Sequence, residues 1–121
     1  MRSVFEIKQN PSGSYYFTFR STDEKAHIIS CSFPHRAQLE ACIAKVRETA
    51  PVADIRIVSS EKTPYFFIQL IEEGISFSLI GFSGERIFSS VFYSDKLLCK
   101  EAIYALKASA ERAAIIDLTY E

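Results

Sequence analysis

The residues with the clearest potential for chemistry are Asp23, His27 and Cys31, each four positions from the next. A cysteine beside a histidine can act as a nucleophile once the imidazole takes its proton. If this stretch is a strand, however, His27 and Cys31 share a face but lie about 13 Å apart, because each residue adds about 3.3 Å. The other histidine, His35, opens a predicted helix and should be exposed. A site built from His27, Asp23 or Cys31 is therefore kept as an alternative, and no catalytic residue is assigned.

Two serines, Ser30 and Ser90, occupy matching positions in two similar stretches of the chain. A nucleophilic serine at a strand-to-helix corner needs the G-x-S-x-G setting and a positioned base. Neither serine has the flanking glycines. Serine at such a corner more commonly hydrogen-bonds the nearby backbone, and we expect that structural role for both.

Metal and cofactor motifs are missing from the sequence. It contains no C-x-x-C, G-x-G-x-x-G, P-loop, H-E-x-x-H or EF-hand pattern, so we expect no metal or cofactor site. The three cysteines, Cys31, Cys42 and Cys99, cannot all pair with one another. Cys42 and Cys99 fall on apolar helical stripes, which predicts reduced core thiols and a cytoplasmic protein.

Composition disfavours nucleic-acid and membrane partners. Fourteen basic and fifteen acidic residues give a net charge of −1. Sixteen aromatic residues, ten Phe and six Tyr, could form a base-stacking platform, but such platforms lie in basic grooves, and no basic cluster is present. Tyr16 is the best candidate for an exposed ring. No apolar run approaches the ~20 residues of a membrane span, and the N-terminus lacks a signal-peptide pattern.

The elements that must position these residues are repeated. Residues 30–46, SCSFPHRAQLEACIAKV, align without a gap on residues 90–106, SVFYSDKLLCKEAIYAL. Each copy reads as the end of a strand, a serine, an aromatic corner and an amphipathic helix. Pro34 and Ser94 are expected to begin the two helices. The helical stripes consist of Leu39, Cys42, Ile43 and Val46, and of Cys99, Ala102, Ile103 and Leu106.

Alternation of apolar and polar residues predicts four strands around each helix. They cover 4–8, 15–20, 26–31 and 54–58 in the first copy, and 65–71, 75–82, 86–91 and 115–118 in the second. The sequence thus predicts an α+β protein of two β3-α-β repeats, about 4–58 and 64–118, within a single compact domain 1–121. One unit has too little core to stand alone, so the two should face each other around a pseudo-twofold axis.

Strand 65–71, YFFIQLI, is apolar almost throughout. An open edge of that kind would aggregate, so we expect the other copy or a second molecule to cover it.

The repeated pattern, a strand, F-x-[FL], a turn, S-x-x-[FY] and a helical I-x-x-[VL], resembles the YegP family of small bacterial proteins of unknown function. The matching residues are Phe17, Phe19, Ser30, Phe33, Ile43 and Val46, and Phe77, Leu79, Ser90, Tyr93, Ile103 and Leu106. The resemblance implies that the last strand of each half crosses to the sheet of the other half.

The sequence departs from the family pattern at two structural positions. The usual Asn-Gly turn is replaced by Asp23-Glu24-Lys25 and Ser83-Gly84, and a usual helical glycine by Cys42 and Ala102. The family offers no established active site, so no catalytic residue carries over.

Every repeated position has a structural explanation. We therefore expect a non-catalytic interaction or ligand-binding module, with a protein or small molecule as its partner, acting as a monomer or homodimer. The alternatives are a small enzyme with a site at the seam between the copies and, more weakly supported, a single-stranded nucleic-acid binder.

Overall fold

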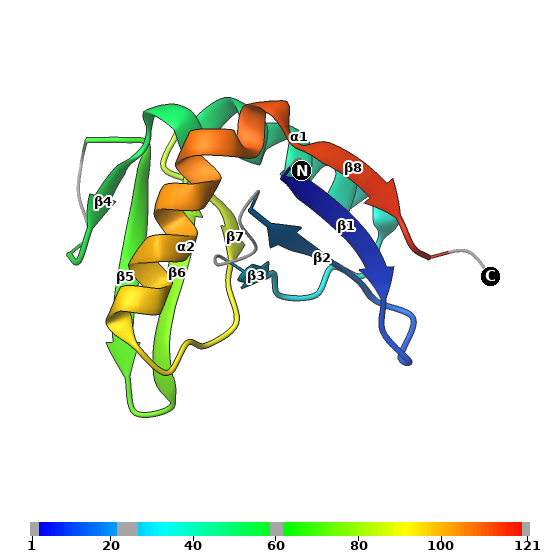
Figure 1. Ribbon diagram of the computed structural model, residues 1–121, viewed down its shortest axis with the longest axis horizontal. Helices are drawn as coiled ribbons and strands as arrows, with labels where there is room; N and C mark the ends of the chain where they lie inside the picture. The colour runs from blue at the N-terminus through cyan, green and yellow to red at the C-terminus, as the bar shows by residue number, and fades with distance from the viewer. Residues whose placement is uncertain (1–2, 22–26, 59–61, 120–121) are drawn as a thin grey trace.

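The computed structural model describes residues 3–21, 27–58 and 62–119. Its strands form two four-stranded sheets, ordered β3-β2-β1-β8 and β4-β5-β6-β7 (Figure 1). The strands of the first sheet are β1 (Val4–Gln9), β2 (Tyr15–Arg20), β3 (His27–Ile29) and β8 (Ala114–Asp117). Those of the second are β4 (Asp54–Arg56), β5 (Tyr65–Ile71), β6 (Gly74–Ile80) and β7 (Arg86–Ser89). The α+β architecture with two similar halves is thus confirmed.

The last strand of each half lies in the sheet of the other half. Strand β8 pairs in parallel with β1, with Phe5 beside Ile115, although the two strands stand near opposite ends of the chain (Figure 1). Strand β4 pairs in the same way with β5, with Ile55 beside Phe66. The strand exchange that the family resemblance implied is therefore present.

The two sheets meet at the repeated serines. Ser30 and Ser90 form an antiparallel bridge with each other. On either side, the Cys31 amide donates to the Ser89 carbonyl at 3.0 Å and the Val91 amide to the Ile29 carbonyl at 2.9 Å. The two matching corners of the halves thus face each other directly.

Both helices begin later than the sequence suggested. Helix α1 (Arg36–Thr49) is preceded by His35 as N-cap, and α2 (Lys96–Ser109) by Asp95, whose carboxylate accepts from the Leu97 amide at 2.8 Å. The expectations for Pro34 and Ser94 were wrong because the chain is still paired as strand just before them. Reciprocal backbone hydrogen bonds tie Phe33 to Tyr15, at 2.8 and 2.7 Å, and the Tyr93 corner is held likewise to Ile75.

Several strands are shorter than predicted. The strand expected over 54–58 ends at Arg56, and Ile57 and Val58 are 61% and 66% exposed, so burial does not hold them in the sheet. The strand expected over 26–31 is described as His27–Ile29, and the preceding turn, with Asp23-Glu24-Lys25, lies outside the described residues. Short 3-10 turns, η1 (Ala50–Val52) and η2 (Ala110–Arg112), follow the helices.

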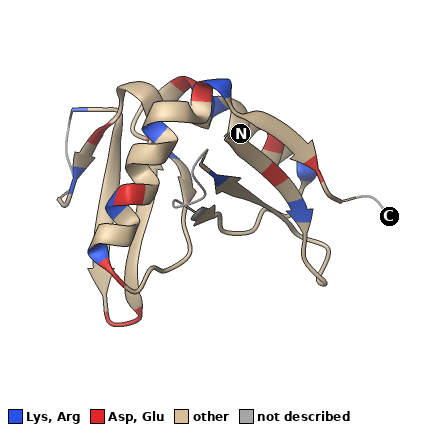
Figure 2. Cartoon of the chain, viewed as in Figure 1, with Lys and Arg blue, Asp and Glu red and all other residues tan. Residues whose placement is uncertain are grey.

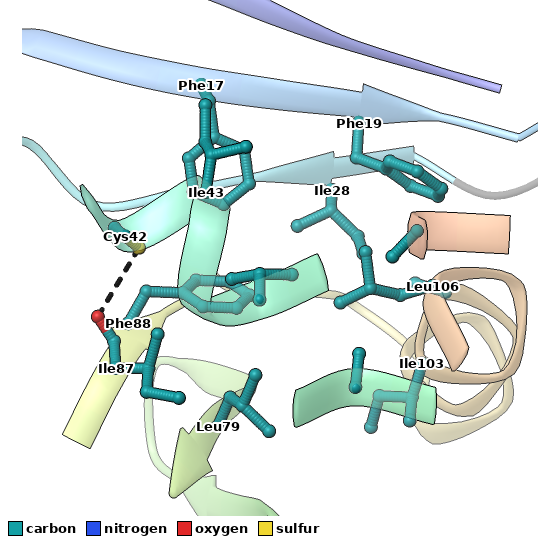
Figure 3. Close-up of a cluster of buried hydrophobic side chains, with 14 of the residues drawn as sticks. Phe17, Phe19, Ile28, Cys42, Ile43, Leu79, Ile87, Phe88, Ile103 and Leu106 are labelled. Carbon is teal, nitrogen blue, oxygen red and sulfur yellow. Dashed lines mark hydrogen bonds between the residues drawn. The ribbon is translucent and has the colours of Figure 1, made fainter. Parts of the chain in front are cut away.

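One hydrophobic cluster draws side chains from both halves (Figure 3). Phe88 packs against Phe17 of the first half, with ring centroids 5.2 Å apart, and against Phe77 of its own half at 5.6 Å. Helix α1 contacts both β2 and β7. The predicted helical stripes are buried as expected: Leu39, Cys42, Ile43 and Val46 on α1, and Cys99, Ala102, Ile103 and Leu106 on α2.

Candidate functional site

A cleft of about 180 Å³ opens where α1 lies against the crossed strand β8 and its neighbour β1. Its apolar walls come from Ile7 on β1, Ile43 and Ala44 on α1, and Ile115 on β8. Glu40 and Arg47 supply its polar groups. The four helical residues stand at i, i+3, i+4 and i+7 and so share one face of α1. Because Ile115 comes from the second half, the cleft requires the strand exchange.

Arg36, one turn before Glu40, joins α1 to the end of β8. Its guanidinium donates to the Asp117 carboxylate, to the Thr119 hydroxyl at 2.9 Å and to Glu40 at 3.4 Å. Asp117 also accepts from the hydroxyl and amide of Thr119, at 2.6 and 2.9 Å. The pKa of Asp117 is lowered to about 2. The largest cause is the hydrogen bond from Arg36, and the hydrogen bonds from Thr119 are the next largest.

This ion pair predicts a pH dependence of stability. A carboxyl with a lowered pKa stabilises the fold above its unfolded pKa, about 3.9, and loses that contribution as the pH falls towards 2. We expect Asp117→Asn to be less stable than the unsubstituted protein near neutral pH, with the difference shrinking below about pH 4. Urea unfolding across this range measures the difference, and a carboxyl NMR titration of Asp117 near its ordinary pKa would contradict the assignment.

Two equivalent basic residues fix the crossing strands in place. Arg47, in the last turn of α1, donates to the Ala113 carbonyl just before β8, and Lys107, in the last turn of α2, donates to the Ala53 carbonyl just before β4. A cation in this position also offsets the negative end of the helix dipole. Sequence reasoning missed both residues, although the sixty-residue alignment places one basic side chain on the other.

Arg47, which contributes to the lining of the cleft, has one further donor. Its Nε is buried and has no hydrogen-bond partner among the described residues. An unmatched N–H of a cation is unfavourable in a low-dielectric position. Arg47, a lining residue of the cleft, therefore carries an unused donor.

The repeated serines have the structural role that was expected. The Ser30 hydroxyl accepts from the Phe17 amide at 3.0 Å and donates to its neighbouring carbonyl, that of Cys31, at 2.9 Å. The Ser90 hydroxyl likewise accepts from the Phe77 amide at 3.1 Å. Both serines are buried and hold the second strand of their half against the corner.

The structure does not assemble Asp23, His27 and Cys31 into a described site. Asp23 lies outside the described residues, and for His27 only the strand position, beside Arg20, is described. His35 is exposed, as expected, and Cys31 is exposed as well. Within the described parts of the chain, no group of three His, Cys, Asp or Glu side chains could hold a metal ion.

The core cysteines are buried as the helical stripes predicted. The Cys42 thiol donates to the Ile87 carbonyl at 3.4 Å, across the boundary between the halves (Figure 3). Burial raises the pKa of Cys42 to about 12 and that of Cys99 to about 11. Both thiols are thus held protonated, which removes them as nucleophiles.

Most of the aromatic rings serve the core. Phe5, Phe17, Phe19, Phe66 and Phe77 are fully buried. Tyr16, the ring expected to be exposed, is half-buried, whereas three residues that sequence reasoning did not single out are about half exposed: Phe82, Phe92 and Tyr104. Acidic and basic residues are interspersed along α2 and in the first sheet rather than gathered into a basic stripe (Figure 2). Over the described residues, no helix has the length and apolar character needed to span a bilayer.

No protein-family model matches the sequence, and no curated protein matches it. Two solved structures are similar over nearly the full length of both chains. One is the solution NMR structure of YegP from E. coli, a protein of unknown function: the TM-score is 0.72 at 19% identity, covering 100% of this chain and 97% of the other. The second is a UPF0339 protein from Shewanella oneidensis, with a TM-score of 0.71 at 15% identity, covering 98% and 93%. With two similar halves that exchange their last strands, this chain has the YegP fold that its repeated motifs predicted.

Proposed function

We propose that this protein is a non-catalytic binding module that holds a small aliphatic carboxylate in the cleft between α1 and β8. The observation that carries the proposal is the unpartnered Nε of Arg47 beside the apolar walls formed by Ile7, Ile43 and Ile115. Small-molecule sites are usually concave and mostly apolar, with a few polar groups that fix orientation. A guanidinium is well suited to a carboxylate, since its N–H donors match the two oxygens.

The other polar groups around the cleft favour binding over catalysis. Glu40 and Asp117 are both paired with Arg36. A general base needs a pKa near the working pH, whereas the pKa of Asp117 is lowered to about 2. The cleft volume of about 180 Å³ suits a short chain of carbon atoms better than a nucleotide or a peptide.

The second half supplies a test variant. Tyr104 stands on α2 at the position that Ala44 occupies on α1. It is 58% exposed, so a tyrosine is compatible with this place on the helix. Ala44→Tyr should fill the cleft of the first half without disturbing the core.

Hexanoate is a suitable probe, with hexylamine as its charge-reversed control. We expect hexanoate to shift the amide NMR signals of Ala44, Arg47 and Ile115, and Ala44→Tyr to weaken this binding at least about tenfold. Ala41→Tyr places the same side chain at an exposed position outside the cleft lining and should bind normally. The proposal fails if hexanoate shifts none of these signals, if hexylamine binds equally well, or if both tyrosine variants behave alike.

A further inference from the structure

We infer that two copies of this chain associate through the open edge of β5, joining their second sheets into one continuous sheet. Strand β6 covers one side of β5 along its whole length, from Tyr65 to Ile71. On the other side, β4 covers only Tyr65 to Phe67. The β5–β6 hairpin projects past the end of β4 (Figure 1). Strand β4 of the other half, which was expected to cover YFFIQLI, therefore pairs with less than half of the strand, Tyr65 to Phe67.

The uncovered part of β5 presents backbone groups as well as apolar side chains. The Asp54 amide donates to the Pro64 carbonyl, so alternation along the strand turns the amides and carbonyls of Phe66, Ile68 and Leu70 towards this edge. The amide and carbonyl of Phe66 face β4. Within the described residues, the amides and carbonyls of Ile68 and Leu70 lie beyond the end of β4 and can pair with another strand.

The matching edge in the first sheet, that of β1, is covered further along its length. There the ladder runs one step further, since the Leu118 amide donates to the Ile7 carbonyl at 2.8 Å. Ile68 is the counterpart of Ile7, because each pairs with the matching phenylalanine of its second strand, Phe77 and Phe17. Leu70 then matches Gln9, and Ile57 matches the ion-paired Asp117. The matching edges of the two halves thus differ: that of the first sheet is polar, and that of the second is apolar.

Apolar side chains surround this open edge. Leu70 is 64% exposed, and Ile71 and Ile57 are 49% and 61% exposed. A hollow of about 340 Å³ runs along the edge and is lined by Ile57 and by Phe67, Ile68, Gln69, Leu70 and Ile71. Proteins generally protect an exposed apolar edge strand or use it to pair with another strand.

Geometry and charge favour a second copy as the occupant. An antiparallel twofold pairing that leaves β4 in place sets Leu70 opposite Leu70 of the second copy, so that the same patch is used on both sides. This register carries the acidic turn of each copy, Glu72 and Glu73, to the end of the other copy's β4. Arg56 stands at that end; it is paired with the exposed Asp54, and a guanidinium has donors for further acceptors. The charges of the two copies are therefore complementary.

Sedimentation and light scattering of the full chain test the inference. We expect a dimer that becomes monomeric in Leu70→Lys, because a lysine on an edge strand opposes pairing. Leu118→Lys is the matched control: Leu118 is 49% exposed beside the other sheet, and its substitution should leave the dimer intact. A monomer at every concentration overturns the inference, as does a dimer that survives Leu70→Lys or is lost equally in Leu118→Lys.

A charge exchange tests the register itself. Glu73→Arg and Arg56→Glu should each raise the dimer dissociation constant by roughly threefold to tenfold, and the double variant should restore it. Single variants that dissociate no more readily than the unsubstituted chain would contradict this arrangement. The dimer dissociation constant is measured without hexanoate, so the proposal for the cleft and the inference for the β5 edge can fail separately.

Discussion

Replacing Phe88 with alanine is expected to lower the free energy of unfolding by about 3–5 kcal/mol. Phe88 is 2% exposed and is the ring that touches both Phe17 and Phe77, so its removal leaves a cavity at the boundary between the halves. The packing of ring against ring adds to the burial of area. Since the whole fold of such a protein is stable by only about 5–15 kcal/mol, this single change should remove a large share of its stability.

Urea unfolding measures the effect as a lower midpoint with an unchanged slope. Phe82→Ala removes the same side chain from a position that is 56% exposed, and we expect a change within about 0.5 kcal/mol. A loss below about 1 kcal/mol for Phe88→Ala would mean that the contacts of this ring contribute little to stability, contrary to the packing in Figure 3.

The sequence predicted the features that depend on periodicity. The stripe from Leu39 to Val46 and the strand alternation of Phe17 and Phe19 follow from local geometry, because a buried face must recur at the period of its element. The repeated sequence pattern then predicted that the halves cover each other. The strand exchange came from the family resemblance, since no local pattern tells β8 whether its partner is β1 or β5.

Element ends and the candidate cleft depend on contacts that the sequence does not display. Ser94 and Asp95 are both good N-caps, and what decides between them is the pairing of Tyr93 with the distant Ile75. The cleft joins Ala44 to Ile115, seventy-one positions further along, so its lining could be named only after β8 had been placed. The sequence shows that Arg47 is basic, but its acceptor is the backbone carbonyl of Ala113. Every residue has such a carbonyl, so the residue type at 113 does not reveal the contact.

We propose that the two halves form one folding unit, so neither should fold alone as a monomer. Residues 1–62 without the second half lack β8 beside β1, and Phe17 lacks Phe88. Residues 63–121 lack β4 beside β5, and the Ile87 carbonyl lacks the Cys42 thiol. A unit of this size buries too little apolar surface to offset its loss of chain entropy. At low concentration, each half should give an amide NMR spectrum without the dispersion of a folded protein.

Mixing the halves should restore the dispersed spectrum, because each half supplies the strand and the core side chains that the other half is missing. The matched control keeps the chain covalent and adds a short Gly-Ser segment at 59–61. Doubling such a connection costs only about 0.6 kcal/mol, so this variant should remain folded. A separated half that is monomeric and unfolds cooperatively would show that the two halves are independent domains. The shared cluster around Phe88 would then be an interface between them and not a common core.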